Sequence, residues 1–196
     1  MSIVSLVSGG LDSTLMAVLA KEAELTIYPL FINYGQISYD RELAACKFVL
    51  NKFKLPYPEI ADVSGIGELI PCGLTDPQMH IFEDAFLPGR NMLFLLLGAS
   101  YAYKMNANSV AIGLLDESVS IFPDQTKDFT DEAESLISRA YGRNINILTP
   151  LISFTKDDVI ELAKEKGISN TYSCHSGKDN PCGKCIACKE FNGKEL

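Results

Sequence analysis

Short runs of apolar residues alternate along the chain with stretches in which apolar residues recur every three or four positions. The first pattern is typical of buried parallel strands and the second of amphipathic helices. Strands are predicted over 3–7, 25–32, 57–63, 109–114 and 145–148, and helices over 13–22, 39–53, 91–103, 128–140 and 156–166. This alternation predicts an α/β fold, a doubly wound parallel sheet of the Rossmann-like kind.

Two segments fall outside the alternation. Residues 65–89 carry glycine, proline and acidic residues with weak periodicity, which predicts a long loop, and loops of that length usually have a function. The composition changes once, near Asn170, where a cysteine-rich tail begins. We therefore expect a main α/β domain over 1–170 and a small tail over 171–196 that packs on the same domain.

Composition excludes several classes of protein. The chain has 196 residues, of which 47% are hydrophobic and 21% charged, as expected of a globular protein. The net charge of -8 disfavours stable nucleic-acid binding, because neutralising phosphates needs clustered Lys and Arg. No signal peptide is recognised at the start, and the apolar stretch 92–103 is too short to span a bilayer, so a cytoplasmic protein is expected.

The stretch SGGLDS, residues 8–13, lies where the first strand gives way to the first helix. Gly9 and Gly10 let the backbone approach an anion, Ser8 and Ser13 add hydroxyl donors, and Asp12 can hold the turn or help to position Mg²⁺. The pattern predicts a phosphate-binding loop, whereas two glycines alone would predict only a tight turn. It matches neither the Walker loop, since the lysine is missing, nor the dinucleotide fingerprint.

SGGLDS also resembles the pyrophosphate-binding loop (PP-loop) of the ATP pyrophosphatases, adenine nucleotide α-hydrolase-like proteins that split ATP between its α and β phosphates. That resemblance implies an AMP-forming activation of a carbonyl-type oxygen. It also implies which residues hold ATP, namely Ser8, Gly9, Gly10, Leu11, Asp12, Ser13 and Thr14.

The tail contains Cys174, Cys182, Cys185 and Cys188 in the spacing C-x7-C-x2-C-x2-C. Two overlapping C-x2-C steps and a returning fourth thiolate suit a closed Zn²⁺ site, in which Gly183 permits the tight turn. An iron–sulfur cluster or disulfides are the alternatives, and His175 could replace one cysteine, although a residue beside Cys174 more often packs nearby. With four protein ligands the zinc is expected to be structural.

Three further motifs lie at predicted element boundaries. Tyr34 and Gln36 follow the second strand, and Arg90 and Asn91 begin a buried helix, where an anion is favoured. Thr155 precedes a predicted helix with Asp158 three residues later, which predicts a capping box. Each motif alone has a structural explanation as a strand end, a turn or a helix cap.

Together SGGLDS, NYGQ, PGRNMLFL, IFPD, TPLISFTKDD and the cysteine tail resemble, in this order, the 7-cyano-7-deazaguanine synthases of the queuosine pathway. The resemblance covers nearly the whole chain. It implies a ligase that adenylates 7-carboxy-7-deazaguanine and converts it with ammonia to the nitrile, using ATP and Mg²⁺, with one bound zinc and a homodimeric assembly.

The resemblance also implies roles for individual residues. Ser8, Asp12, Ser13 and Arg90 are the expected catalytic residues, with Arg90 on the substrate carboxylate or the α-phosphate. The residues expected to line the substrate pocket are Tyr34, Gln36, Arg90, Asn91, Asp116 and Asp124.

Some positions depart from the family pattern. Phe122 stands where the family usually has tyrosine, Gln125 replaces a cysteine, and residues 116–118 read Asp-Glu-Ser in place of a Thr-Asp pair. Residues 37–39 lack the usual basic side chains. A divergent relative that activates this or another carboxylate and passes it to a different amine, including one on a protein, would share these features.

Two other classes of function remain open at this stage. A tRNA-modifying relative would need a basic surface or a catalytic cysteine pair, and the charge of -8 argues against it. A non-enzymatic zinc-knuckle binding module would be favoured by a decayed glycine loop, but SGGLDS is intact.

Overall fold

The structure, a computed structural model, describes residues 1–191 and 193. Within this part of the chain, a parallel sheet has the strand order β3-β2-β1-β4-β5. The strands are β1 Ser2–Leu6, β2 Thr26–Asn33, β3 Glu59–Asp62, β4 Ser109–Ala111 and β5 Asn146–Leu148. The order reverses beside β1, and the carboxyl edge at such a switch point is where α/β sheets bind ligands. The predicted fold class is confirmed.

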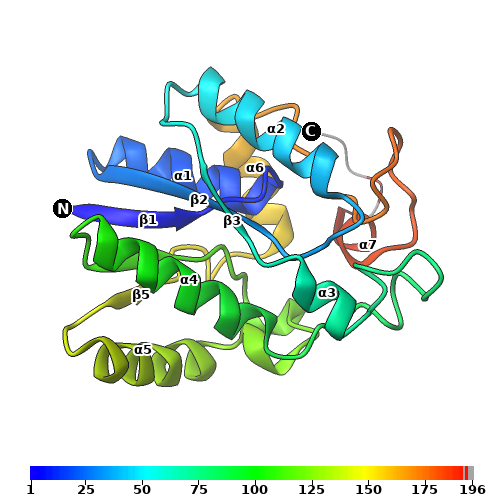
Figure 1. Ribbon diagram of the computed structural model, residues 1–196. Helices are drawn as coiled ribbons and strands as arrows, with labels where there is room; N and C mark the ends of the chain where they lie inside the picture. Colours follow the sequence, from blue (N-terminus) through cyan, green and yellow to red (C-terminus); the bar gives the residue numbers. More distant parts are fainter. Residues whose placement is uncertain (192, 194–196) are drawn as a thin grey trace.

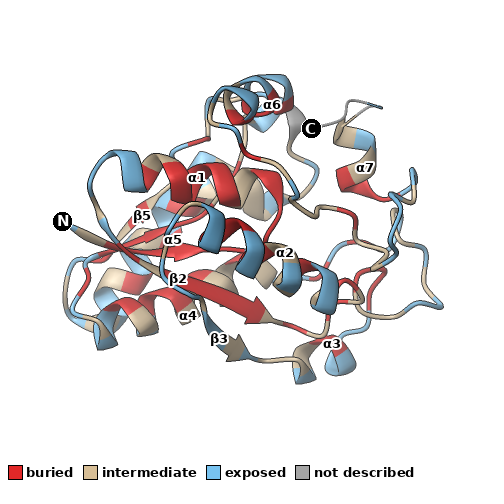
Figure 2. Cartoon of the chain, turned by 90° about the horizontal axis from the view of Figure 1, so that it is seen from above, coloured by how far each residue is buried: buried red, intermediate tan, exposed pale blue. Residues whose placement is uncertain are grey.

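Helices cover both faces of this sheet. Figure 1 shows α1, α2 and α6 on one face and α4 and α5 on the other. The helices are α1 Leu11–Glu22, α2 Tyr39–Lys52, α3 Gly65–Leu69, α4 Arg90–Lys104, α5 Lys127–Tyr141, α6 Lys156–Glu165 and α7 Ile186–Phe191, with 3-10 turns η1 Glu117–Val119 and η2 Pro123–Gln125. Burial is concentrated on the inner strands and on the helix faces that meet them, whereas the edge strand β3 is mostly exposed (Figure 2).

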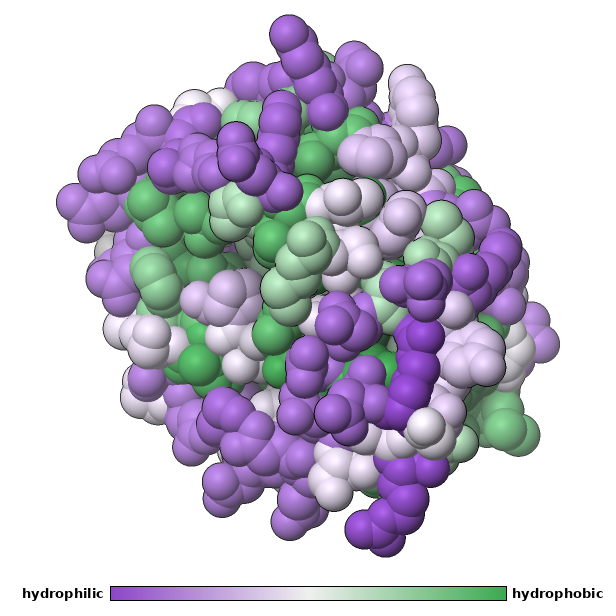
Figure 3. Space-filling model, turned by 90° about the vertical axis from the view of Figure 1, so that its left-hand side faces the viewer, coloured by the Kyte–Doolittle hydropathy of each residue, from purple (hydrophilic) through white to green (hydrophobic). Residues whose placement is uncertain are grey.

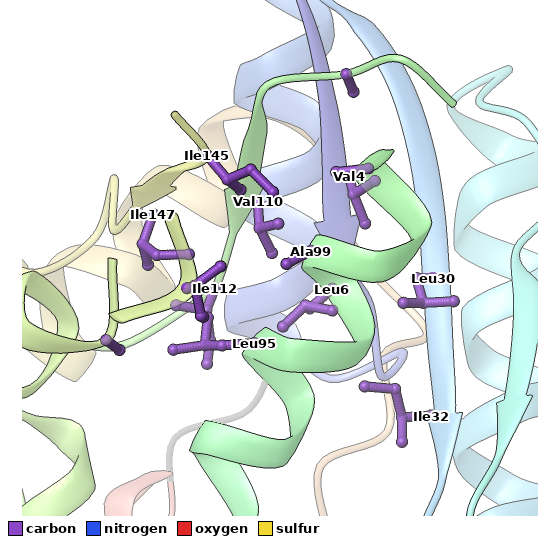
Figure 4. Close-up of a cluster of buried hydrophobic side chains, with 14 of the residues drawn as sticks. Val4, Leu6, Leu30, Ile32, Leu95, Ala99, Val110, Ile112, Ile145 and Ile147 are labelled. Carbon is purple, nitrogen blue, oxygen red and sulfur yellow. The ribbon is translucent and has the colours of Figure 1, made fainter. Parts of the chain in front are cut away.

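The largest buried cluster lies between the sheet and α4 (Figure 4). Val4 and Val110 from neighbouring strands pack there against Leu95 and Ala99 of α4, and all four are fully buried. Gly98 lets the helix press onto the sheet, because a Cβ at this position would lie 2.7 Å from a methyl group of Val110. This packing fixes where α4 begins, and so places Arg90.

Several element ends differ from the predictions. The strand predicted over 109–114 ends at Ala111, because residues 112–114 turn from the sheet toward the cavity described below. Helix α1 begins at Leu11, two residues early, and the predicted loop 65–89 opens with the short helix α3. The tail contains α7, which no periodicity indicated. Its residues 192 and 194–196 lie outside the described part.

The predicted cap of α6 is confirmed. The Thr155 hydroxyl accepts a hydrogen bond from the Asp158 amide at 3.3 Å, and the Asp158 carboxylate accepts one from the Thr155 amide at 2.8 Å. This capping box starts the helix at Lys156, whose side chain then enters the cavity.

The end of the molecule where the strands begin carries hydrophilic side chains over much of its surface, with hydrophobic areas between them (Figure 3). Of the helices in the described residues, none combines the length and the apolar character that crossing a bilayer requires.

Candidate functional site

A cavity of about 280 Å³ opens at the carboxyl edge of the sheet. Its walls come from the loops after β1 and β2, the starts of α4 and α6, and the cysteine tail. The polar and aromatic residues of its lining are Ser8, Asp12, Ser13, Tyr34, Gln36, Glu42, Arg90, Asn91, Phe94, Phe122, Gln125, Lys156, Tyr172, Ser173, His175 and Glu190. Most of the residues predicted from sequence are thus brought together, although they come from distant parts of the chain.

The glycine loop, residues 8–13, forms the floor of this cavity. The Ser13 hydroxyl accepts a hydrogen bond from the Ser8 amide at 3.1 Å and donates one to the Gly10 carbonyl at 3.2 Å. Gly10 is the N-cap of α1 and provides no side-chain cap. The loop therefore brings the Ser8 and Ser13 hydroxyls to the cavity at the start of α1, where the positive end of the helix dipole favours a phosphate.

Gly9 is required for the loop to pass under the cavity. Its φ of +80° favours glycine, and a Cβ there would lie 2.4 Å from the Glu42 carbonyl and 2.5 Å from the Cys46 amide. The loop consequently packs directly on the backbone of α2. Gly9 shapes the cavity without lining it.

Lys156 lies in the cavity beside the glycine loop, and the sequence analysis treated its motif only as a helix cap. Its Nζ is 2.9 Å from both carboxylate oxygens of Asp12 and 3.0 Å from the Glu190 carboxylate. Burial alone would lower the pKa of Lys156, but the two carboxylates outweigh it and raise the pKa, so the ammonium stays charged. Lys156 thus places a cation beside the glycine loop, whose residues 8–13 include no lysine or arginine.

Arg90 lies across the cavity, at the start of α4. Its guanidinium carbon is 5.8 Å from the ring centre of Tyr34 and 6.0 Å from that of Phe94, within cation–π range. Burial raises the pKa of Tyr34 against the lowering influence of Arg90, so the phenol is neutral. The two rings contact each other, with centres 5.4 Å apart, so the guanidinium lies against a pair of aromatic side chains, and its planar donors suit a carboxylate.

Glu42 is a second residue that the sequence analysis missed. Its carboxylate is 8% exposed and accepts hydrogen bonds from the Ser38 hydroxyl at 2.6 Å and the Gln36 amide at 3.1 Å. Gln36 in turn accepts from the Tyr34 amide at 2.9 Å. Burial raises the pKa of Glu42, against hydrogen bonds from Ser38 and Gln36 that lower it. This network fixes the loop after β2 to α2.

Some predicted residues lie outside the cavity lining. Asp116 caps η1 by accepting a hydrogen bond from the Ser118 amide at 2.9 Å. Asp124 accepts one from the Asn91 amide at 3.2 Å and so holds the start of α4. Leu11 and Thr14 face inward, because the first turn of α1 buries one side in the core. Asp116 and Asp124 therefore stabilise the backbone of η1 and the start of α4, and neither lines the cavity.

Two of the departures from the family pattern, Phe122 and Gln125, lie in the cavity wall, whereas residues 37–39 and 116–118 do not line it. Phe122 stacks on Phe86 with ring centres 4.9 Å apart, and both Phe122 and Gln125 line the cavity. The Gln125 side chain accepts hydrogen bonds from the Ile121 and Phe122 amides at 2.9 and 2.8 Å, and so ties this segment into a turn.

The four tail cysteines converge. Their Sγ atoms all lie within 4.8 Å of one another, with those of Cys182 and Cys188 3.9 Å apart. A tetrahedral ion with sulfur ligands at about 2.3 Å separates its sulfurs by about 3.8 Å, whereas a cluster of several irons holds its cysteines farther apart. All six cysteines of the chain belong to the described residues and are free thiols. The four thiols can hold a metal ion, and His175 is not one of the group.

Backbone amides point at these sulfurs. Cys182 donates to the Cys174 sulfur at 3.3 Å, and Cys185 donates to the Cys182 sulfur at 3.3 Å. Burial alone would raise the pKa of Cys174, but hydrogen bonds from Ser176 and Cys182 lower it to about 6. Gly183 has a φ of +67°, a conformation that favours glycine and fits the tight turn predicted there. The donors offset the charge of thiolates gathered at one point.

The tail also forms one wall of the cavity. The Tyr172 amide donates to the Gly9 carbonyl at 2.9 Å, and Ser173 accepts from the Leu11 amide at 3.4 Å. Ser173 therefore lies next to the glycine loop, and His175 and Glu190 line the same cavity. Burial, with Arg90 and Lys156 nearby, lowers the pKa of His175 to about 4, so its imidazole is neutral.

Solved structures with similar folds support the fold class. NMN synthetase from Francisella tularensis superposes with a TM-score of 0.58 at 15% identity, over 100% of this chain and 78% of that one. The U34-tRNA thiolase NcsA from Methanococcus maripaludis, solved with its [4Fe-4S] cluster, gives a TM-score of 0.53 at 14% identity, over 98% and 64%. At these identities the similarity concerns the fold alone.

Sequence relatives are more informative. Proteins named 7-cyano-7-deazaguanine synthase are similar over nearly their whole length. That of Campylobacter jejuni subsp. jejuni serotype O:6 is 32% identical over 93% of this chain and 88% of its own, and that of Nitratiruptor sp. is 32% identical over 96% and 91%. The model of a family described as queuosine biosynthesis protein QueC matches residues 2–192. The chain belongs to the QueC family.

Proposed function

We propose that this protein is an ATP-dependent, AMP-forming ligase that converts 7-carboxy-7-deazaguanine and ammonia to 7-cyano-7-deazaguanine. The observation that carries the proposal is the pairing of two cationic sites across one cavity. Lys156 adjoins the glycine loop, and Arg90 lies beside Tyr34 and Phe94. An acid and a nucleotide must meet in such a cavity for adenylation to occur, and QueC relatives bear the name of this enzyme.

The phosphate end of the cavity is the glycine loop with Lys156. Ser8, Gly10 and Ser13 would hold the β and γ phosphates by backbone and hydroxyl hydrogen bonds, and Lys156 would neutralise part of their charge. Asp12 would help to hold Mg²⁺, which supplies further positive charge to the departing pyrophosphate. Both cations stabilise charge that grows as pyrophosphate leaves.

The acid end is the cluster around Arg90. A carboxylate held there directs one oxygen at the α-phosphorus, so that an acyl adenylate forms and pyrophosphate leaves. Ammonia then attacks the acyl carbon and AMP leaves, which gives the amide. A second ATP adenylates the amide oxygen, and loss of AMP and a proton gives the nitrile. Positioning is the main task of the protein in each step.

We propose Zn²⁺ as the ion of the four-cysteine site. The spacing of the sulfurs and the amide donors aimed at them fit a single tetrahedral ion. Four thiolates leave no open coordination position, so the ion holds the tail, residues 171–196, as a wall of the main domain over 1–170.

The remaining expectations rest on the family resemblance. We propose a cytoplasmic homodimer that acts on small molecules without stable nucleic-acid binding, consistent with the net charge of -8. A tRNA-modifying activity is less consistent with the net charge of -8, and a purely binding role is less consistent with the intact glycine loop.

A second candidate is favoured by the departures at Phe122 and Gln125, which line the cavity. In that case the acid is adenylated in the same way, but a different amine, including one on a protein, accepts the acyl group. The phosphate end would be unchanged, and only the acceptor would differ.

One experiment separates these candidates. The protein is incubated with ATP, Mg²⁺, ammonium and 7-carboxy-7-deazaguanine, and the products are identified by mass spectrometry. Amide and nitrile with AMP and pyrophosphate are expected. Pyrophosphate without amide or nitrile would favour the second candidate, whereas ADP as the nucleotide product would contradict both.

A further inference from the structure

Gln125 carries a hydrogen-bond donor that the fold leaves unused. Its side-chain oxygen accepts hydrogen bonds from the Ile121 and Phe122 amides at 2.9 and 2.8 Å. Because backbone N–H groups can only donate, they identify this atom as the oxygen and leave the NH₂ group, Nε2, facing elsewhere. Among the described residues, none accepts a hydrogen bond from Nε2.

This donor is also accessible. Gln125 is half-buried and lines the cavity. The buried side-chain nitrogen and oxygen atoms that lack a partner in the described residues belong to Ser5, Thr14, Arg143 and His175. Nε2 of Gln125 lacks a partner but is not one of these atoms, so part of its surface is exposed. The cavity wall therefore offers a donor whose direction is already fixed by two backbone hydrogen bonds.

Gln125 is tied to the start of α4, at the acid end of the cavity. Its neighbour Asp124 accepts two hydrogen bonds from Asn91, one from the backbone amide at 3.2 Å and one from the side-chain amide at 2.8 Å. Asn91 directly follows Arg90, the cation proposed above for the carboxylate. Gln125 is thus attached to the same corner of the cavity as that guanidinium.

The turn that Gln125 holds also contributes to the apolar wall at this end. Phe122 packs in one cluster with Tyr34 and Phe94, whose rings lie beside Arg90. Aromatic side chains of this kind suit the faces of a flat heterocycle, and a polar group beside them suits its edge. The segment that carries Gln125 therefore belongs to the acid site.

We propose that Nε2 of Gln125 donates a hydrogen bond to the ring carbonyl of the acid and thereby selects which acid is adenylated. The inference rests on the proposed function, and both candidates above share the adenylation of the acid. In 7-carboxy-7-deazaguanine the ring carbonyl and the carboxylate lie side by side on one edge of the fused rings, so one corner of the cavity can hold both. A site that hydrogen-bonds a substrate rejects analogues that lack the matching group.

The test uses Gln125→Glu, in which one carboxylate oxygen can still accept from the Ile121 and Phe122 amides while the donor becomes an acceptor. Two acids are compared, 7-carboxy-7-deazaguanine and its analogue with an amino group in place of the ring carbonyl. Acid-dependent ATP–pyrophosphate exchange gives kcat/KM for each acid and the KM for ATP. Gln78→Glu is the matched control, because it adds the same charge at an exposed residue outside the cavity lining.

The wild type is expected to prefer the acid with the carbonyl. Gln125→Glu should lower the ratio of kcat/KM for this acid to that for the amino analogue by about 10–100-fold, the loss typical of an unmatched polar group, with the KM for ATP unchanged. An effect of the added charge on the carboxylate is common to both acids and cancels in the ratio. An unchanged ratio, including an equal loss of exchange with both acids, would overturn this inference alone. Absence of exchange with either acid in the wild type would overturn the proposed function together with it.

Discussion

The glycine loop and the cysteine tail form adjoining walls of one cavity, but they are held in different ways. The loop follows the central strand β1, which pairs on both sides, and Gly9 packs on the backbone of α2. The tail has a small buried cluster around Cys174, Cys185 and Ala187, adds Ile186 to the cluster around Tyr34, and brings four thiols together. The sheet holds the glycine loop in place. The tail contains no strand, so we expect a bound metal ion to hold its shape.

The contact between the two walls explains why both matter for chemistry. Lys156 joins Asp12 of the glycine loop to Glu190 of the tail helix α7. The cation that we propose for the phosphates is therefore held by both regions at once. Changes in either wall should affect catalysis, but only changes in the tail should depend on the metal.

The largest effect is expected from the residue that joins the walls. Lys156→Met should lower kcat/KM in ATP–pyrophosphate exchange by about 10³-fold, since one charge-stabilising donor contributes about this factor. Lys166→Met is the matched control, because Lys166 lies at the end of α6 and pairs with Glu22 instead. A loss of less than threefold would show that Lys156 does not meet the phosphates.

Loss of the metal should displace the tail but leave the glycine loop and the sheet in place. Cys185→Ser, at a fully buried position, is expected to abolish zinc binding and to lower exchange by about 10²-fold, as a displaced wall misplaces the substrates. Cys72→Ser controls for replacing a buried thiol outside the cluster. Zinc content and exchange are measured together. Full exchange in a zinc-free Cys185→Ser protein would contradict the role of the tail as a wall.

The glycine loop should instead be sensitive to its backbone shape. Gly9→Ala combines a positive φ with a Cβ 2.4 Å from the Glu42 carbonyl, and should reduce the free energy of unfolding by about 1–3 kcal/mol. Gly142→Ala isolates the strain, because Gly142 has a φ of +64° but no atom within 4 Å of its Cβ. Thermal unfolding compares the two. Equal losses in Tm would mean that the close approach to α2 is unimportant.

The smallest effect is expected from Glu42, which supports the loop after β2. Burial raises the pKa of its carboxyl, so the folded state binds the proton more tightly than the unfolded state. Stability is therefore lost as pH rises from about 4.3, the unfolded value, through the folded pKa. Glu42→Gln should be stabilised relative to the wild type by a few degrees in Tm at pH 7 and by less at pH 4. A difference in Tm that does not change with pH would contradict this assignment.

Much of the molecule could be predicted from the sequence because the signals are local. The alternation of apolar runs and helical periodicities predicted the parallel sheet, and short spacings predicted the glycine loop, the capping box and the convergence of four thiols. The predicted end of β4 and the predicted start of α1 were less accurate. The residues at these boundaries lie beside the cavity, where contacts with distant parts of the chain decide the backbone conformation.

The sequence by itself therefore determined the order of strands and helices and the two short motifs, since periodicity and spacing act within a few residues. Only the tertiary structure decided that Lys156 meets Asp12, which lies 144 positions earlier, and that Glu42 and His175 face the same cavity. It also placed Asp116 at the cap of η1, outside the cavity lining where we expected it. Contacts between such distant residues depend on how the helices pack on the sheet, and this packing cannot be predicted from a local sequence pattern.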